Sequence, residues 1–176
     1  DAMPNPVPWP SPRRLAVGGL HRVAWREVGD AHGEPWLLLH GGPGGACQPG
    51  MLRPFDLQRQ RVIAPDQRGA GASRPKGRTE GNHTAALVAD LERLRAQLGI
   101  ERWAVLAGSW GTVVALAYAR QHPQRVQRLV LRGAFPLTRR EIGGLLLPSV
   151  QRGQTLRAPA ALWPVRRGDG VPMALA

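Results

Sequence analysis

The stretch 103–117 constrains the fold more than any other part of the chain. Its first part, 103–106, is an apolar run that predicts a short buried strand, and the alanine-rich run after Gly111 predicts a helix. Between them, Ser109 has the small residue Ala107 two positions before it and Gly111 two positions after it. Small residues at these positions allow a tight strand-to-helix turn that exposes the serine hydroxyl. We therefore predict that Ser109 is a nucleophile; a tight turn that happens to contain a serine is the simpler alternative.

Strands and helices are predicted to alternate along the chain. Apolar runs and alternating patterns predict a β-hairpin over 15–28 and strands over 36–39, 61–65, 103–106 and 126–131. Helical periodicity predicts helices over 84–98 and 111–122, with Gly99 and Pro123 as their stop signals. This alternation predicts an α/β fold with a mostly parallel sheet flanked by helices, and with functional loops at the carboxyl ends of the strands.

Two glycine-rich loops follow predicted strands. Residues 40–45 follow the strand 36–39, and a glycine-rich loop allows the backbone to approach a ligand closely. In folds with a serine at a strand-to-helix turn, such a loop supplies one backbone N–H to an oxyanion hole, and we assign this to Gly42. Trp110, at the start of the helix, supplies the other N–H. A plain Gly/Pro turn is the alternative for Gly42. His40 precedes the serine, whereas the catalytic histidine of this fold follows it, so His40 is expected to structure the loop.

Asp66 begins the second loop, which we expect it to hold together with Arg68 by charge-assisted hydrogen bonds.

Composition narrows the possible partners. The net charge is +12, but the arginines are scattered and Lys76 is the only lysine, so we expect no nucleic-acid partner. No apolar run reaches the length of a membrane span, and no Cys/His cluster has the spacing of a metal site. The single cysteine, Cys47, excludes an internal disulfide and suits a reducing compartment, so a cytoplasmic location is expected.

Several motifs occur together in a consistent order and spacing. They are 40–44 (HGGPG), 66–69 (DQRG), 87–92 (LVADLE), 98–100 (LGI), 108–111 (GSWG) and 129–133 (LVLRG). From about residue 15 to residue 141 the chain resembles the proline iminopeptidases, serine peptidases of the α/β-hydrolase fold. It departs from them at Ala107, where the family usually has glycine, and at Thr112, where serine is frequent.

This resemblance implies that the protein removes N-terminal proline from a peptide substrate. Ser109 would attack the prolyl carbonyl, the N–H groups of Gly42 and Trp110 would hold the oxyanion, and no metal or organic cofactor would be needed. The family reads the substrate amine with acidic residues of a helical cap, and those positions have no match in this chain. Another hydrolase of the fold, an esterase or amidase, and a non-catalytic remnant are the alternatives.

The residues after Ser109 lack the rest of a catalytic triad. The fold requires an acid and then a histidine, yet only Glu141, Asp169 and His122 follow, and no histidine comes after either acid. His122 is 13 positions from Ser109 (122 − 109), which is about 20 Å along a helix. We therefore expect an N-terminal part of a longer enzyme that is inactive alone. Its expected parts are a proline-rich arm (1–14), a partial hydrolase core (15–141), and the start of a cap or an aberrant tail (142–176). Its oligomeric state is left open.

Overall fold

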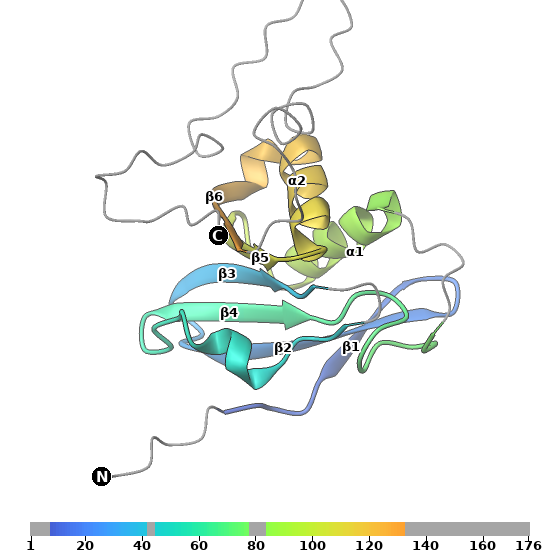
Figure 1. The fold of residues 1–176 in the computed structure, drawn as a ribbon, viewed down its shortest axis with the longest axis horizontal. Helices are drawn as coiled ribbons and strands as arrows, with labels where there is room; N and C mark the ends of the chain where they lie inside the picture. The colour runs from blue at the N-terminus through green and yellow to red at the C-terminus, as the bar shows by residue number, and fades with distance from the viewer. Residues whose placement is uncertain (1–7, 42–44, 78–83, 133–176) are drawn as a thin grey trace, which may run out of the picture.

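The computed structural model describes residues 8–41, 45–77 and 84–132, which form one six-stranded sheet with helices packed on it (Figure 1). The strands are β1 (Arg13–Gly18), β2 (His21–Gly29), β3 (Glu34–Leu39), β4 (Gln60–Pro65), β5 (Trp103–Gly108) and β6 (Val126–Arg132). The helices are α1 (Thr84–Gln97) and α2 (Gly111–Gln121), with short 3-10 turns η1 (Pro49–Leu52) and η2 (Pro123–Arg125).

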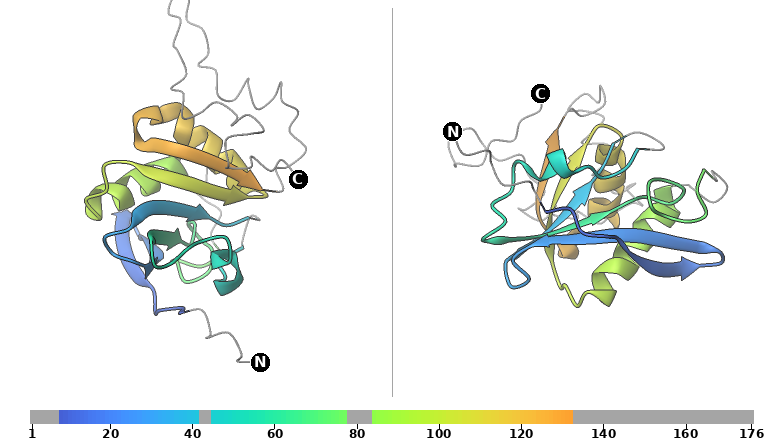
Figure 2. Two further views of the ribbon diagram at one scale, coloured as in Figure 1. Left: turned by 90° about the vertical axis from the view of Figure 1, so that its left-hand side faces the viewer. Right: turned by 90° about the horizontal axis from the view of Figure 1, so that it is seen from below.

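The sheet has the order β1-β2-β4-β3-β5-β6. Strands β4, β3, β5 and β6 run parallel, and the β1–β2 hairpin joins them through an antiparallel pairing of β2 with β4. The sheet is strongly twisted: in the right-hand view of Figure 2, the hairpin crosses the direction of β6 steeply. The predicted mostly parallel α/β sheet is confirmed, and so is the N-terminal hairpin.

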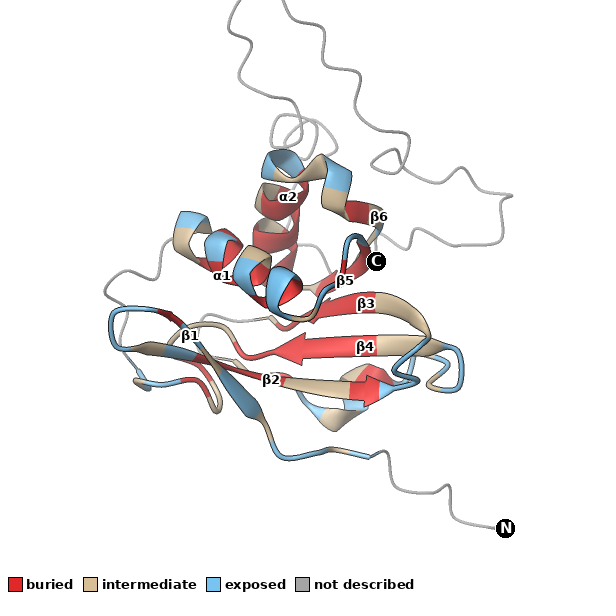
Figure 3. Cartoon of the chain, turned by 180° about the vertical axis from the view of Figure 1, so that it is seen from behind, coloured by how far each residue is buried: buried red, intermediate tan, exposed pale blue. Residues whose placement is uncertain are grey.

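Two hydrophobic cores lie on opposite faces of this sheet because successive side chains of a strand alternate. Leu37 and Leu39 of β3 pack with the inner faces of α1 and α2, which Figure 3 shows as buried. Trp36 and Leu38 point to the other face, where Leu52 of η1 packs against them. The central strands are covered on both faces, as their continuous apolar sequences predict.

The helix boundaries follow the stop signals in the sequence. At the end of α1, Gly99 has a φ of +65°, and the N–H of Ile100 donates to the Arg95 carbonyl at 3.2 Å. This left-handed glycine cap ends α1 one residue before the predicted boundary. Pro123 follows the end of α2 and begins η2. Within the described residues, we find no helix with the length and apolar character needed to cross a membrane.

Candidate active site

Ser109 occupies the turn between β5 and α2, at the carboxyl end of the parallel strands. Its φ is +50°, and it is the one left-handed non-glycine residue in the part of the chain that the structure describes. Such a conformation costs about 1–3 kcal/mol and is kept only where neighbouring contacts impose it. The Ser109 N–H donates to the Arg132 carbonyl at 3.1 Å, and its carbonyl accepts from the N–H and the hydroxyl of Thr112 at 3.0 and 2.7 Å. The side chain of Ser109 is exposed, as a nucleophile requires.

The loop after β3 packs directly on this turn. A β-carbon at Gly111 would lie 2.6 Å from the carbonyl oxygen of His40 and 2.9 Å from that of Leu39. A β-carbon at Gly41 would lie 2.9 Å from the β-carbon of Ser109. These separations are shorter than any normal contact, so both positions require glycine. The requirement for a small residue at position 111 is confirmed, and its physical cause is the backbone at the end of β3.

Of the two predicted oxyanion donors, Trp110 lies in the described part of the chain. Trp110 precedes the first residue of α2, so its N–H lies at the positive end of the helix dipole. Among the described residues, no hydrogen-bond acceptor is found for the Trp110 N–H. Gly42 lies outside the described residues. Its predecessor, Gly41, contacts Ser109.

His40 joins the loop after β3 to the loop after β4. Its Nε2 accepts a hydrogen bond from the Gln67 N–H at 2.9 Å, and its Nδ1 lies 2.9 Å from the Gly41 carbonyl oxygen. The Gln67 side chain donates to the His40 carbonyl at 3.1 Å. Only 1% of His40 is exposed, and this burial lowers its pKa below the ordinary 6.5. The prediction that His40 structures the loop is confirmed.

Asp66 organises the loop after β4 from its buried position. One carboxylate oxygen accepts the N–H of Cys47 and the other accepts the N–H of Ala72, both at 2.9 Å. Arg26 lies 3.6 Å from the same carboxylate. Because Cys47 belongs to the segment after β3, Asp66 also fixes the spacing between the two loops. Burial, followed by the charge of Asp66, raises the pKa of the Cys47 thiol and keeps it protonated.

The guanidinium of Arg68, which is predicted to hold the loop after β4 together with Asp66, reaches α1. It donates to both oxygens of Asp90, at 2.6 and 2.9 Å. This bidentate geometry ties the loop after β4 to α1. Burial raises the pKa of Asp90 against the opposing effect of Arg68.

His122 lies at the far end of α2 from Ser109. It follows the last residue of α2, and its Nδ1 is 3.9 Å from an oxygen of Glu92. The 11 residues of α2 span about 16 Å, too far for proton transfer to Ser109. Glu141 and Asp169 lie outside the described residues. Across the described ranges, three or more His, Cys, Asp or Glu side chains nowhere converge as metal ligands would.

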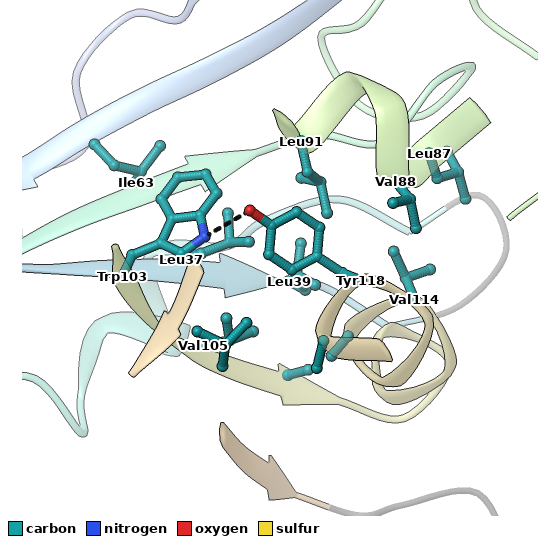
Figure 4. Close-up of a cluster of buried hydrophobic side chains, with 14 of the residues drawn as sticks. Leu37, Leu39, Ile63, Leu87, Val88, Leu91, Trp103, Val105, Val114 and Tyr118 are labelled. Carbon is teal, nitrogen blue, oxygen red and sulfur yellow. Dashed lines mark hydrogen bonds between the residues drawn. The ribbon is translucent and has the colours of Figure 1, made fainter. Parts of the chain in front are cut away.

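A buried polar network was not foreseen in the sequence. Figure 4 shows Trp103 of β5 donating through its indole N–H to the Tyr118 hydroxyl of α2, at 3.2 Å. The Tyr118 hydroxyl donates in turn to Glu92 of α1 at 2.5 Å. Arg95 binds the same carboxylate at 2.8 and 3.0 Å. The network joins the strand and the helix on either side of Ser109, at their ends away from it. A signal was available: Tyr118 stands on the apolar face of an alanine-rich helix.

Comparisons with known proteins agree with this geometry. A family model described as alpha/beta hydrolase fold matches residues 34–175. A proline iminopeptidase of Xylella fastidiosa (strain Temecula1) is 45% identical over 158 residues, which are 88% of this chain and 50% of that protein. A proline iminopeptidase of Arabidopsis thaliana is 47% identical over 128 residues, 73% of this chain and 34% of that protein.

Solved structures extend the similarity to the fold. The crystal structure of a proline iminopeptidase-related protein from Thermus thermophilus has a TM-score of 0.64 at 33% identity, covering 70% of this chain and 44% of that one. Epoxide hydrolase A from Mycobacterium thermoresistibile has a TM-score of 0.57 at 29% identity, covering 70% and 39%. The chain thus spans between about a third and a half of the length of these relatives. The turn at Ser109, the parallel sheet beneath it and the family match over most of the sequence lead to one conclusion: this chain belongs to the alpha/beta hydrolase fold family.

Proposed function

We propose that this chain supplies the nucleophile and the oxyanion hole of a serine aminopeptidase that releases N-terminal proline from peptides. The observation that carries the proposal is the exposed, left-handed Ser109 with Gly41 packed against it. It occurs in a chain that is 45–48% identical to relatives named proline iminopeptidases.

The proposed chemistry uses few groups. The Ser109 hydroxyl attacks the carbonyl of the N-terminal proline and its proton passes to a histidine, which later protonates the leaving amine. The N–H groups of Trp110 and Gly42 hold the oxyanion, and each such donor stabilises the transition state by about 2.7–4 kcal/mol. Water then releases proline from Ser109. The substrate class rests on the relatives' names.

The histidine and its acid are proposed to come from a region outside the matched segment. No acid followed by a histidine occurs after Ser109, and the matched segment covers 50% of the Xylella relative. His122 is held at Glu92, away from the nucleophile. The chain by itself is therefore proposed to lack peptidase activity. The buried thiol of Cys47 supports a reducing compartment, and we propose a cytoplasmic location on that ground.

The test compares this chain with a longer polypeptide in which the chain is followed by the part of the Xylella relative that lies beyond the match. Release of naphthylamine from prolyl-β-naphthylamide is expected for the longer protein and not for this chain. Ser109→Ala in the longer protein should abolish the release, whereas the matched control Ser11→Ala, at an exposed position, should leave it unchanged. Equal or faster cleavage of alanyl-naphthylamide, or of nitrophenyl esters, would favour another hydrolase. Activity of this chain alone that depends on Ser109 would contradict the proposed source of the base.

A further inference from the structure

His40 lies between two loops and the turn that carries Ser109. Through its ring it reaches Gln67 on one side and the Gly41 carbonyl on the other. Its own carbonyl accepts from the Gln67 side chain and faces Gly111, the first residue of α2. A small displacement of His40 would therefore move the position of Gly41 relative to Ser109.

The hydrogen bonds define one tautomer of the ring. The backbone N–H of Gln67 can only donate, so Nε2 must carry a lone pair and no proton. In a neutral imidazole the proton is then on Nδ1, which donates it to the Gly41 carbonyl at 2.9 Å. Both ring nitrogens are satisfied in this state alone. A proton on Nε2 would place two donors against each other.

Few charged groups surround the ring. From the loop after β4, the carboxylate of Asp66 favours a charged ring, but this carboxylate is already engaged by two backbone N–H groups and Arg26 of β2. From the segment after β3, the neutral thiol of Cys47 lies at the His40 backbone. The turn 109–112 offers no charged side chain. Burial is the largest effect on the ring and lowers its pKa.

We propose that His40 is a proton-sensitive positioning residue. When neutral, it links the loops after β3 and β4 and holds Gly41 against Ser109. When protonated, it keeps its Nδ1–H donor to Gly41 but loses the acceptor for Gln67, so the loop after β4 no longer fixes His40, and with it Gly41, relative to Ser109. Its consequence for catalysis rests on the proposed function, since Gly41 precedes the proposed oxyanion donor Gly42. The hydrogen-bonded link that His40 makes between the loops after β3 and β4 does not depend on any activity of the chain.

Two substitutions separate the two ring nitrogens. His40→Gln can present an amide oxygen near the Nε2 position, so it keeps an acceptor for Gln67 and cannot titrate. His40→Asn can present an amide N–H near the Nδ1 position, so it keeps a donor for Gly41 and loses the acceptor. His32→Asn, at an exposed histidine between β2 and β3, is the matched control.

The experiment is an NMR titration of the 176-residue chain from about pH 8 to about pH 4. The ring nitrogen shifts of His40 are expected to report the Nδ1–H tautomer at the alkaline end. As the ring gains a proton, the amide signals of Gln67, Gly41 and Ser109 should move in step with it. Protection of the Gln67 amide from exchange, beyond the intrinsic pH effect, should fall about tenfold.

The variants provide the remaining outcomes. His40→Gln should remove the pH step, His40→Asn should show the acid-type signals already at alkaline pH, and His32→Asn should behave as the wild-type chain. An Nε2–H tautomer, amide signals that ignore the His40 titration, or a ring that stays neutral until the chain unfolds would each overturn the proposal. None of these measurements involves hydrolysis, so they test the role of His40 even if the proposed function proves wrong.

Discussion

Tyr118→Phe tests whether the buried network at the foot of α2 stabilises the turn at Ser109. The substitution removes only the hydroxyl, which accepts from the Trp103 indole and donates to Glu92. Trp103 and Tyr118 are both 0% exposed, so no water can replace the lost oxygen at the indole. Burial, aided by Glu92, raises the pKa of the Tyr118 hydroxyl, which therefore remains a donor at neutral pH.

The expected loss follows from the two bonds. A buried indole N–H left without an acceptor costs about 1–3 kcal/mol, and a hydrogen bond to a charged group contributes about 1.5–3 kcal/mol. Glu92 has 21% of its side chain exposed and keeps its bond to Arg95. The loss of the Tyr118–Glu92 hydrogen bond should therefore cost no more than the lower end of its range, about 1.5 kcal/mol. The free energy of unfolding should fall by about 2–4 kcal/mol in total. With a slope of about 2 kcal/mol per molar urea, the midpoint should fall by about 1–2 M.

Urea unfolding followed by far-ultraviolet circular dichroism measures this loss without relying on the fluorescence of Trp103. In a Glu92→Ala background, Tyr118→Phe should retain only the cost at the indole, and the difference between the two backgrounds gives the coupling of Tyr118 to Glu92. A loss below about 0.5 kcal/mol in the wild-type background, the size of an ordinary surface substitution, would refute the reasoning. An unchanged loss in the Glu92→Ala background would refute the share assigned to Glu92.

Three further outcomes are expected from the same unfolding assay. Gly111→Ala should cost about 1–3 kcal/mol through its clash with the end of β3, whereas Gly50→Ala, where a β-carbon meets nothing within 4 Å, should change stability by less than about 0.5 kcal/mol. Asp90→Asn should cost about 3 kcal/mol because it breaks a buried ion pair, while Glu34→Gln, in an exposed pair, should cost at most about 1 kcal/mol; equal losses would contradict the role of burial. The free energy of unfolding should fall as the pH drops below 6.5, since the folded state holds His40 below that pKa and the unfolded chain takes up the proton first; a slope that His40→Gln does not flatten would exclude His40 as its source.

The elements of this fold could be predicted because each follows from a local pattern. The helical period of 84–98 and the glycine after it define α1 to within a residue, and the apolar run before Pro65 defines β4. The meeting of the loops after β3, β4 and β5 was also predictable, since the carboxyl ends of parallel strands share one edge. The order of the strands was not: β4 lies between β2 and β3, and nothing in a single strand's sequence encodes its neighbour.

The partners of polar side chains were the least predictable part of the site. Arg68 is two residues from Asp66 and 22 from Asp90, yet its bidentate bond is to Asp90, because the loop directs its side chain toward α1. Tyr118, Trp103 and Glu92 belong to three elements whose relative positions depend on packing. The sequence predicts a small residue at position 111. The backbone atoms that require it, however, lie 71 positions earlier, at His40 (111 − 40).

The strained turn at Ser109 needs no triad partner to hold it. Its cost of about 1–3 kcal/mol is opposed by hydrogen bonds to Arg132 and Thr112. The contact with Gly41 and the joint of β5 to α2 through Tyr118 add to these. All of these groups belong to the described part of the chain, and none of them is an acid or a histidine that could activate the serine. Presentation of the nucleophile and its activation are thus structurally separable in this fold, so a Ser109 that is correctly presented and yet inert is consistent with the geometry.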